Sequence, residues 1–321
     1  MSEPRVLVYR ASQDDEPPGI ATADVDVRYA PDPDALADQI ADAEVLFFYR
    51  ADKRDLEAAY PRGRNLRWIQ TGSAGVDGLL FPDLIGSDVV VTNARGVFDD
   101  AIAEWTVGAM LAFATGIVTS LVDQRDHRWN DERHTERLAG TRLLVVGPGP
   151  IGRAVARRAR DLGMDVAAVG TRGRDDPELG HVHAADTFHE ALADADHVVD
   201  ALPLTEGTVR LFDASAFAAM RGGARFYNVG RGGTVDEQAL VDALRDGRVG
   251  GAALDVFEEE PLPADSPLWS MPNVIVSPHI CGDYEGWEVD VVRVFTDNLA
   301  RYVRGDPLAN VVDKTRGYGA G

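Results

Sequence analysis

The chain has 321 residues, 45% hydrophobic and 26% charged, so it is long enough for two domains with separate cores and is neither disordered nor fibrous. Its formal charge of -21 argues against nucleic acid as a partner, because nucleic-acid phosphates are bound by basic side chains. A single cysteine, Cys281, excludes an internal disulfide framework and is typical of a reducing compartment, so we expect a cytoplasmic protein.

The acidic excess also favours a salt-rich cytoplasm. The chain has 53 acidic residues and 32 basic ones, and only two of the basic residues are lysines. Repulsion among so many carboxylates is unfavourable in dilute salt, whereas at molar ionic strength it is screened over about 3 Å. We hypothesise a protein from a halophile; an acidic enzyme from an ordinary cytoplasm is the alternative.

Neither the N-terminus nor the longest uncharged run predicts a membrane partner. Residues 1–5 have no basic stretch leading into an apolar core, so no secretory signal is expected. Residues 105–122 carry no charge and approach the length of a membrane span. Their threonine, serine and glycine content favours instead a helix buried between domains or subunits.

The first part of the chain alternates strands with helices. Asp32 and Pro33 have the pattern of an N-cap followed by proline at the first helical position, which predicts a helix to about residue 43. Strand-like apolar runs occupy residues 6–9, 25–27, 45–49, 66–69 and 89–91. This order predicts a small parallel α/β unit.

A loop of small residues, 71–77, follows the fourth of these strands. It lies at the carboxyl edge, where open α/β sheets bind ligands, so its backbone N–H groups are candidates for binding an anion. A plain strand-to-helix turn is the other interpretation. Residues 93–96 then break the pattern and mark the expected domain crossing, before a long apolar helix around 104–122 and a polar surface arm over 127–137.

The second part of the chain begins with a glycine loop between an apolar strand and a helix. The apolar run ends at Gly147, and Gly149 and Gly152 complete a G-x-G-x-x-G pattern. The first glycine permits a tight turn, the second lets a pyrophosphate approach the backbone, and the third lets helix and strand pack closely. Apolar residues recur at helical spacing after the loop: Ile151, Val155, Ala159 and Leu162. We interpret this as a dinucleotide site; a glycine turn of another α/β protein is the alternative.

The strands of this second part match the count of a complete dinucleotide-binding fold. They are expected at residues 143–146, 166–169, 197–202, 224–228, 252–256 and 274–276. A last helix over 285–303, with Val291, Val294, Phe295, Leu299 and Tyr302 on one face, returns to the first domain in this interpretation. The predicted fold is α/β with two doubly wound parallel sheets, in domains 1–96 with 285–321 and 97–284.

The end of the second of these strands favours NADP over NAD. An NAD-binding unit normally has Asp or Glu there, about 20 residues past the glycines, to hold the ribose hydroxyls. This chain has Gly170 followed by Thr171, and Arg172 and Arg174 are placed to pair with a 2'-phosphate. Asp175 and Asp176 come next, and we interpret them as solvated loop residues.

Three later segments place reactive side chains at the carboxyl ends of successive strands: residues 228–233, 254–261 and 277–282. An arginine binds a carboxylate through two parallel hydrogen bonds, and a histidine transfers protons near neutral pH. A carboxylate beside the histidine fixes its tautomer and favours its charged form. Three such residues beside a dinucleotide loop predict an active site.

These segments resemble the D-isomer-specific 2-hydroxyacid dehydrogenase family, which includes glyoxylate/hydroxypyruvate reductases. The resemblance runs from about Gly72 to residues 310–314 and is most specific over Gly-Arg-Gly at 230–232, residues 252–262 and Ser-Pro-His at 277–279. It implies a Rossmann-type coenzyme domain and a smaller, flavodoxin-like substrate domain around a cleft, usually in a homodimer through the coenzyme domain.

The resemblance also implies roles for residues. Arg231 would bind the substrate, His279 would act as acid/base, and Glu260 would be the partner of His279. Ser73, Ala74 and Gly75 would hold the substrate carboxylate together with Arg231 and His279. The cofactor-binding set would be Gly147, Gly149, Pro150, Ile151, Gly152, Thr171, Arg172, Arg174, Leu202, Pro203, Thr208, Val229, Asp255 and Cys281, with Asp255 at the nicotinamide carboxamide. Cys281 stands where the family more often has Ala or Gly.

The implied reaction is hydride transfer between nicotinamide C4 and C2 of a 2-keto or 2-hydroxy acid, with NADP(H) preferred and NAD(H) as the other cofactor. A formate or phosphite dehydrogenase is an alternative, although formate enzymes of this superfamily have glutamine where Glu260 stands. An NAD(P)-sensing corepressor resembling the C-terminal binding proteins is another.

Several polar residues are given no role in this interpretation. The histidines 181, 183 and 189 are interpreted as surface-loop residues and not as metal ligands, so no metal is expected. Glu258 and Glu259 are expected to be solvated, and His127, His134 and His197 are assigned no function.

Overall fold

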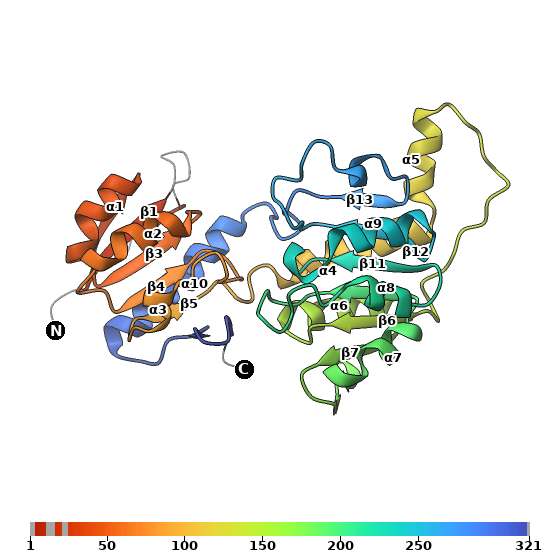
Figure 1. Cartoon of the computed structure of the whole chain (residues 1–321). Helices are drawn as coiled ribbons and strands as arrows, with labels where there is room; N and C mark the ends of the chain where they lie inside the picture. Colours follow the sequence, from red (N-terminus) through yellow and green to blue (C-terminus); the bar gives the residue numbers. More distant parts are fainter. Residues whose placement is uncertain (1–3, 11–16, 21–24, 320–321) are drawn as a thin grey trace. The chain divides into compact units, whose positions relative to one another are not determined.

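A computed structural model describes residues 4–10, 17–20 and 25–319 of the chain. It divides into two compact units, Met1–Phe98 with Glu285–Gly321, and Asp99–Tyr284. Both are α/β units built on parallel sheets, as the sequence predicts, and Figure 1 shows each with its helices. Residues 1–3, part of the N-terminal stretch in which no secretory signal is expected, lie outside the described residues.

The first unit is built on a five-stranded sheet in the order β2-β1-β3-β4-β5. Every pair in it is parallel, which confirms the predicted parallel unit and is the strand order of flavodoxin-like folds. The strands are β1 (Arg5–Arg10), β2 (Asp26–Ala30), β3 (Val45–Tyr49), β4 (Trp68–Thr71) and β5 (Val90–Thr92). All residues of β3 are buried, so its apolar run forms the centre of the core.

The helices of this unit begin where the sequence places caps. The Asp32 carboxylate accepts a hydrogen bond from the Ala35 N–H at 2.8 Å, confirming the N-cap of α1 (Pro33–Gln39), which continues as the 3-10 turn η1 (Ile40–Asp42). The others are α2 (Lys53–Ala59), η2 (Tyr60–Arg62) and α3 (Pro82–Ile85). A short antiparallel pair, β14 (Val312–Asp313) and β15 (Tyr318–Gly319), follows near the C-terminus.

The last helix, α10 (Trp287–Arg304), belongs to the first unit although it follows the second in sequence. Its Phe295 ring stacks on Phe47 of β3 with centroids 4.4 Å apart, and Asn298 donates to the buried Gln70 side chain at 3.2 Å. Figure 1 shows this blue helix beside the strands of that unit. The expected return of the helix is therefore confirmed; of its predicted apolar face, Val294 and Tyr302 are only half-buried.

The second unit contains an eight-stranded sheet in the order β13-β12-β11-β10-β6-β7-β9-β8. All its pairs are parallel except β8 with β9. The strands are β6 (Arg142–Val146), β7 (Asp165–Gly170), β8 (Arg174–Asp176), β9 (Gly180–Ala184), β10 (His197–Asp200), β11 (Ala224–Asn228), β12 (Val249–Leu254) and β13 (Val274–Val276). The six predicted strands are present, and the order around β6 is that of dinucleotide-binding sheets.

The sequence interpretation missed β8 and β9. We expected His181 and His183 in a surface loop, which is wrong: both lie in β9, where Val182 between them is fully buried and pairs with Ala168 of β7. A single buried valine between polar neighbours is too short an apolar signal to predict a strand. The helices of the unit are α4 (Asp99–Ala114), α5 (Ile117–Arg125), α6 (Pro150–Asp161), α7 (Phe188–Ala193), α8 (Ala214–Ala219) and α9 (Glu237–Arg245), with 3-10 turns η3 (Ala185–Thr187), η4 (Gly232–Thr234) and η5 (Pro267–Ser270).

The expected long helix around 104–122 is two helices. Gly116 has φ +72, a left-handed conformation, and α4 and α5 meet there at 65°. Within the single chain Ile117 is 50% and Leu121 62% exposed, so burial of α5 between subunits stays a prediction. No single helix in the described part of the chain is long and apolar enough to cross a membrane; the bent pair α4 and α5 passes on length and composition alone.

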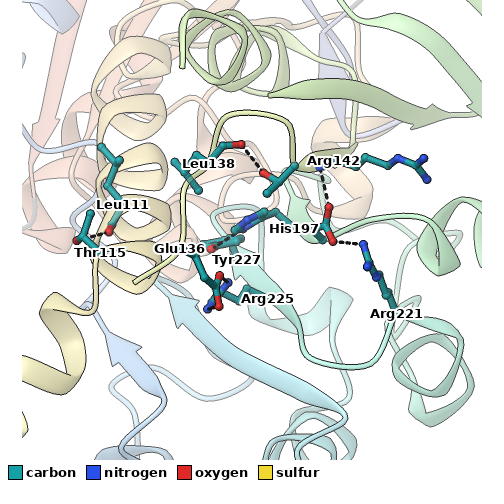
Figure 2. Close-up of polar contacts among 11 residues, drawn as sticks. Leu111, Thr115, Glu136, Leu138, Arg142, His197, Arg221, Arg225 and Tyr227 are labelled. Carbon is teal, nitrogen blue, oxygen red and sulfur yellow. Dashed lines mark hydrogen bonds and ion pairs between the residues drawn. The ribbon is translucent and has the colours of Figure 1, made fainter. Parts of the chain in front are cut away.

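The predicted surface arm is present as an extended segment after α5 (Figure 1). Residues 127–137 are exposed except for Arg133, which is half-buried, and Trp129 is 91% exposed. The arm returns through Glu136, whose carboxylate accepts two hydrogen bonds from the Arg225 guanidinium, at 2.7 and 3.0 Å (Figure 2). This bidentate pair joins the arm to β11.

Candidate functional site

The glycine loop after β6 has the geometry that a dinucleotide requires. Gly147 has φ +103, and a Cβ there would lie 2.7 Å from the Ala201 carbonyl oxygen. A Cβ on Gly152 would lie 2.2 Å from the Gly147 carbonyl, so only glycine lets α6 pack this closely on β6. Gly149, the N-cap of α6, has open space in front of it. Pro150 and Ile151 form the first helical turn, whose N–H groups suit a phosphate.

The loop after β7 is where the ribose of a dinucleotide lies in such folds. Gly170 ends the strand, and Thr171 and Arg172 are exposed beyond it. Among the described residues no carboxylate pairs with Arg172. Arg174 lies in β8, with its guanidinium 3.7 Å from the Asp176 carboxylate.

Asp176 is not the solvated loop residue that we expected. It is 9% exposed and accepts two hydrogen bonds from the Arg153 guanidinium, at 2.9 and 2.6 Å, and two more from the Glu178 and Leu179 N–H groups. The Arg153 hydrogen bonds hold the pKa of Asp176 well below its usual range. The carboxylate therefore closes the β8–β9 hairpin against α6, and its charge is already compensated by Arg153.

Arg231 is fixed by the two glycines on either side of it. A Cβ on Gly230 would lie 2.6 Å from the Leu202 carbonyl oxygen, and one on Gly232 would lie 1.9 Å from the Phe257 backbone. The Gly-Arg-Gly segment after β11 is thus packed between two other chain segments. The Arg231 guanidinium donates from Nη1 to the Gly230 carbonyl at 2.8 Å.

His279 and Glu260 form a direct pair. The His279 Nδ1 lies 2.7 Å from Oε2 of Glu260, and the other Glu260 oxygen accepts the Phe257 N–H at 2.9 Å. His279 has φ +58, a left-handed conformation that few side chains adopt and that marks a fixed position. With Nδ1 bonded to the carboxylate, the His279 proton available to a substrate is on Nε2.

The electrostatics of this pair favour a charged histidine. The hydrogen bond to Glu260 raises the pKa of His279, against burial and the charge of Arg231, which lower it. Burial raises the pKa of Glu260, but hydrogen bonds from His279 and the Phe257 N–H, with the charges of His279 and Arg231, bring it below its usual value. Arg231 therefore acts on both members of the pair, and the three predicted catalytic residues come together in the second unit.

Asp255 has a structural task that sequence reasoning missed. It is 1% exposed, and its Oδ1 accepts hydrogen bonds from the Ser277 hydroxyl at 2.6 Å and from the Ile280 N–H at 3.0 Å. The Cys281 N–H lies 3.2 Å from both carboxylate oxygens. Asp255 thus shapes the turn that carries His279. Burial raises the pKa of the Cys281 thiol, so this cysteine is a neutral packing residue.

The other predicted cofactor-lining residues lie near the carboxyl ends of β10 and β11. The Thr208 hydroxyl donates to the Pro203 carbonyl at 2.6 Å and accepts the Thr205 N–H at 2.8 Å, which fixes the turn after Leu202. Val229 is 4% exposed, directly after β11.

The predicted anion loop lies in the first unit, directly after β4. The Ser73 hydroxyl donates to the Gly75 carbonyl at 2.6 Å, and the Asn93 amide donates to the Ala74 carbonyl at 2.6 Å. Within the described ranges, the N–H groups of Ala74 and Gly75 donate to no other residue. The carbonyl oxygens of Ala74 and Gly75 are hydrogen-bonded within the protein, whereas their N–H groups are available to bind an anion.

The sequence is similar to known oxidoreductases along most of its length. The family model described as "D-isomer specific 2-hydroxyacid dehydrogenase, NAD binding domain" matches residues 107–281. A glyoxylate reductase of Thermofilum pendens is 32% identical over 98% of this chain and 96% of that protein. The chain belongs to the D-isomer specific 2-hydroxyacid dehydrogenase family.

Solved structures of the family share the fold. A probable 2-hydroxyacid dehydrogenase of Rhizobium etli, in complex with NADP, HEPES and L(+)-tartaric acid, has a TM-score of 0.83 at 29% identity and covers 98% of this chain and 100% of its own. An NADPH-dependent glyoxylate/hydroxypyruvate reductase of Sinorhizobium meliloti, in complex with NADP and sulfate, has a TM-score of 0.84 at 26% identity with the same coverage.

Members of this family are NAD(P)-dependent oxidoreductases that act on the CH–OH group of 2-hydroxy acids, and this chain is an oxidoreductase of that kind. Its glycine loop fits the dinucleotide on the geometry of Gly147, Gly149 and Gly152. Among the residues that the structure describes, no group of three or more His, Cys, Asp or Glu side chains is arranged to hold a metal ion.

Proposed function

We propose that the protein is an NADP-dependent D-2-hydroxyacid dehydrogenase that works as a 2-keto acid reductase. The observation that carries the proposal is the 2.7 Å pair of His279 and Glu260, acted on by the charge of Arg231, in the unit that holds the dinucleotide loop. Glyoxylate and hydroxypyruvate are the first substrates to test, because a similar S. meliloti protein is named for reducing them.

The reaction follows from the chemistry of these side chains. The bound cofactor supplies the hydride that reaches C2 of the keto acid. The Arg231 guanidinium binds the substrate carboxylate and stabilises the negative charge that develops on the carbonyl oxygen. Protonated His279 donates from Nε2 to that oxygen, and Glu260 keeps His279 charged and oriented. The N–H groups of Ala74 and Gly75 are proposed as further donors to the substrate carboxylate.

The preference for NADP rests on the loop after β7. Gly170 provides no carboxylate to repel a 2'-phosphate, and Asp176, the next buried acid along the chain, is paired with Arg153. Arg172 is exposed beside Gly170 and is the proposed partner of the 2'-phosphate. The NADP complexes of two similar structures support this choice.

Steady-state kinetics test both parts of the proposal. NADPH and NADH are compared with glyoxylate, hydroxypyruvate, pyruvate and longer 2-keto acids, in wild type and in Arg172→Ala. We expect turnover with NADPH, and a KM for NADPH raised about tenfold or more in the variant with little change for NADH. Arg64→Ala, an exposed arginine of the first unit, is the control. Absence of turnover across the panel would favour a nucleotide-sensing or formate-type protein.

Two further parts of the proposal are a salt-adapted protein, which the acidic composition supports, and a homodimer through the second unit, which the resemblance to the family implies. Thermal unfolding from low to molar KCl tests the first: stability should rise with salt, and greatest stability without salt would contradict it. Light scattering in molar KCl tests the second and should give twice the 34.7 kDa mass of the chain.

A further inference from the structure

Two buried polar residues of the second unit have no part in the reaction described above. Asp200 is the last residue of β10, Thr234 is the last residue of η4, and both are 0% exposed. The neighbours of Asp200 in the sheet are Val146 of β6 and Asn228 of β11, and neither carries a charge. A carboxyl group in such surroundings must be neutral or fully hydrogen-bonded.

The hydrogen bonds of Asp200 lead to Arg231. Oδ1 of Asp200 accepts the Leu202 N–H at 2.9 Å, and Oδ2 lies 2.5 Å from the Thr234 hydroxyl. The same hydroxyl lies 2.5 Å from the Arg231 carbonyl oxygen. Thr234 therefore stands between a buried carboxyl and the backbone of the arginine proposed to bind substrate.

The number of protons shared among Asp200, Thr234 and the Arg231 carbonyl determines whether the Asp200 carboxyl is protonated. A threonine hydroxyl has one proton and donates one hydrogen bond, and a carbonyl oxygen only accepts. If Asp200 were ionised, Thr234 would face two acceptors with a single proton, and one of the two short contacts would be repulsive. Both contacts are hydrogen bonds only when the second proton comes from the Asp200 carboxyl.

We propose that Asp200 carries a proton on Oδ2 and donates it to the Thr234 hydroxyl, which in turn donates to the Arg231 carbonyl. Asp200 and Thr234 are then positioning residues for Arg231; this role rests on the proposed function of Arg231. Burial raises the pKa of Asp200 to about 7, against hydrogen bonds from Thr234 and the Leu202 N–H that lower it, and no charged group contributes.

The Arg231 carbonyl also accepts the Asn228 amide at 3.1 Å and the Thr234 N–H at 3.2 Å, so the hydroxyl at 2.5 Å is its closest donor. When Asp200 loses its proton, the Thr234 proton turns to the carboxylate and Arg231 loses that donor. Val146, Asn228, Thr234 and Leu202, which surround Asp200, do not titrate at neutral pH, so this change follows Asp200 alone. Binding of the keto acid should therefore weaken as the pH rises through neutrality.

Kinetics of four variants test the positioning role. Asp200→Asn keeps a donor toward Thr234, so its KM for the keto acid should match wild type at low pH and rise less with pH, because only the deprotonation of His279 then contributes. Asp200→Leu and Thr234→Val remove the donor, and KM should rise about 2- to 10-fold with a smaller change in kcat. Thr106→Val is the control, because Thr106 is equally buried and donates to the Ile102 carbonyl. A wild-type KM in Thr234→Val, or an unchanged pH dependence in Asp200→Asn, would overturn the role.

Infrared spectroscopy tests the proton without turnover. The difference spectrum between wild type and Asp200→Asn should contain the C=O stretch of a protonated carboxyl at acidic pH, lost as the pH rises through neutrality. Absence of that band would refute the assignment. A protein that shows the band but reduces no keto acid would refute the proposed function and leave the proton on Asp200.

Discussion

Two histidines at opposite ends of the second sheet have opposite properties. His279 follows β13 at the carboxyl end, its side chain is 48% exposed, and Glu260 raises its pKa. His197 begins β10 at the amino end, is 1% exposed, and has Nδ1 3.0 Å from the Tyr227 hydroxyl (Figure 2). Burial and the charge of Arg225 lower the pKa of His197 to about 4, although Asp196 and Glu136 oppose this.

The difference shows what makes a histidine reactive in this fold. Both rings lie near arginine and glutamate side chains, as Figure 2 shows for Arg225 and Glu136 near His197. Of these two rings, that of His279 is bonded directly to a carboxylate, while that of His197 is bonded to a neutral phenol. Direct pairing gives a proton donor, and burial without it gives a neutral residue that holds two strands together.

The largest effect is expected from removing the reactive ring. His279→Ala should lower kcat by about 10²- to 10⁴-fold, because general acid catalysis is lost, while the protein still binds NADPH. Single-turnover kinetics and NADPH fluorescence titration measure the two quantities. Near-normal turnover would remove His279 from the mechanism and, with it, the distinction between the two histidines.

A smaller effect is expected from keeping the ring and removing its charge partner. Glu260 raises the pKa of His279, so the reduction rate of wild type falls only once the pH passes that raised value. In Glu260→Gln the fall should begin at lower pH, and kcat near neutrality should drop about tenfold. The pH profile of kcat/KM measures the shift; Glu259→Gln, the exposed neighbour, should keep the wild-type profile.

Substitution of His197, at the amino end of the sheet, should change stability and leave turnover unchanged. The folded-state pKa of His197 lies below its ordinary 6.5, so folding excludes a proton and stability is lost as the pH falls from about 6.5 to about 4. The loss is at most about 3 kcal/mol. Urea unfolding of wild type and His197→Phe over this range measures it. The variant should have a flatter pH dependence and normal turnover at neutral pH; an equal slope would assign the effect to another group.

The smallest effect is expected at Glu136, whose side chain is 59% exposed. Glu136→Gln weakens the pair with Arg225, whose side chain is 18% exposed, and should cost about 1 kcal/mol or less, since solvent screens the Glu136 carboxylate and the Gln amide oxygen still accepts a hydrogen bond. Limited proteolysis should nevertheless cut the arm, residues 127–137, faster than in wild type. Glu132→Gln, an exposed arm residue outside this pair, should be cut at the wild-type rate.

Most elements that follow from repeated local patterns were predicted from the sequence, and few features that depend on a single side chain were. The strands around β6, the cap at Asp32 and the return of α10 follow from apolar spacing and capping patterns, which are local. The bend at Gly116 was missed because a glycine within an apolar run is compatible both with a continuous helix and with a break between two helices. The burial of Asp176, Asp200 and Asp255 was missed because the hydrogen-bond partners that make it possible, Arg153, Thr234 and Ser277, are distant in sequence.

All three proposed reacting side chains, Arg231, Glu260 and His279, are carried by residues 99–284, together with the nucleotide loop. The matched family domain, residues 107–281, spans the same piece. The redox chemistry of the second unit can therefore stay unchanged during evolution while the first unit changes to bind a different acid. A chimera that joins this second unit to the first unit of another relative should keep the proton donor and acquire the substrate selectivity of that relative.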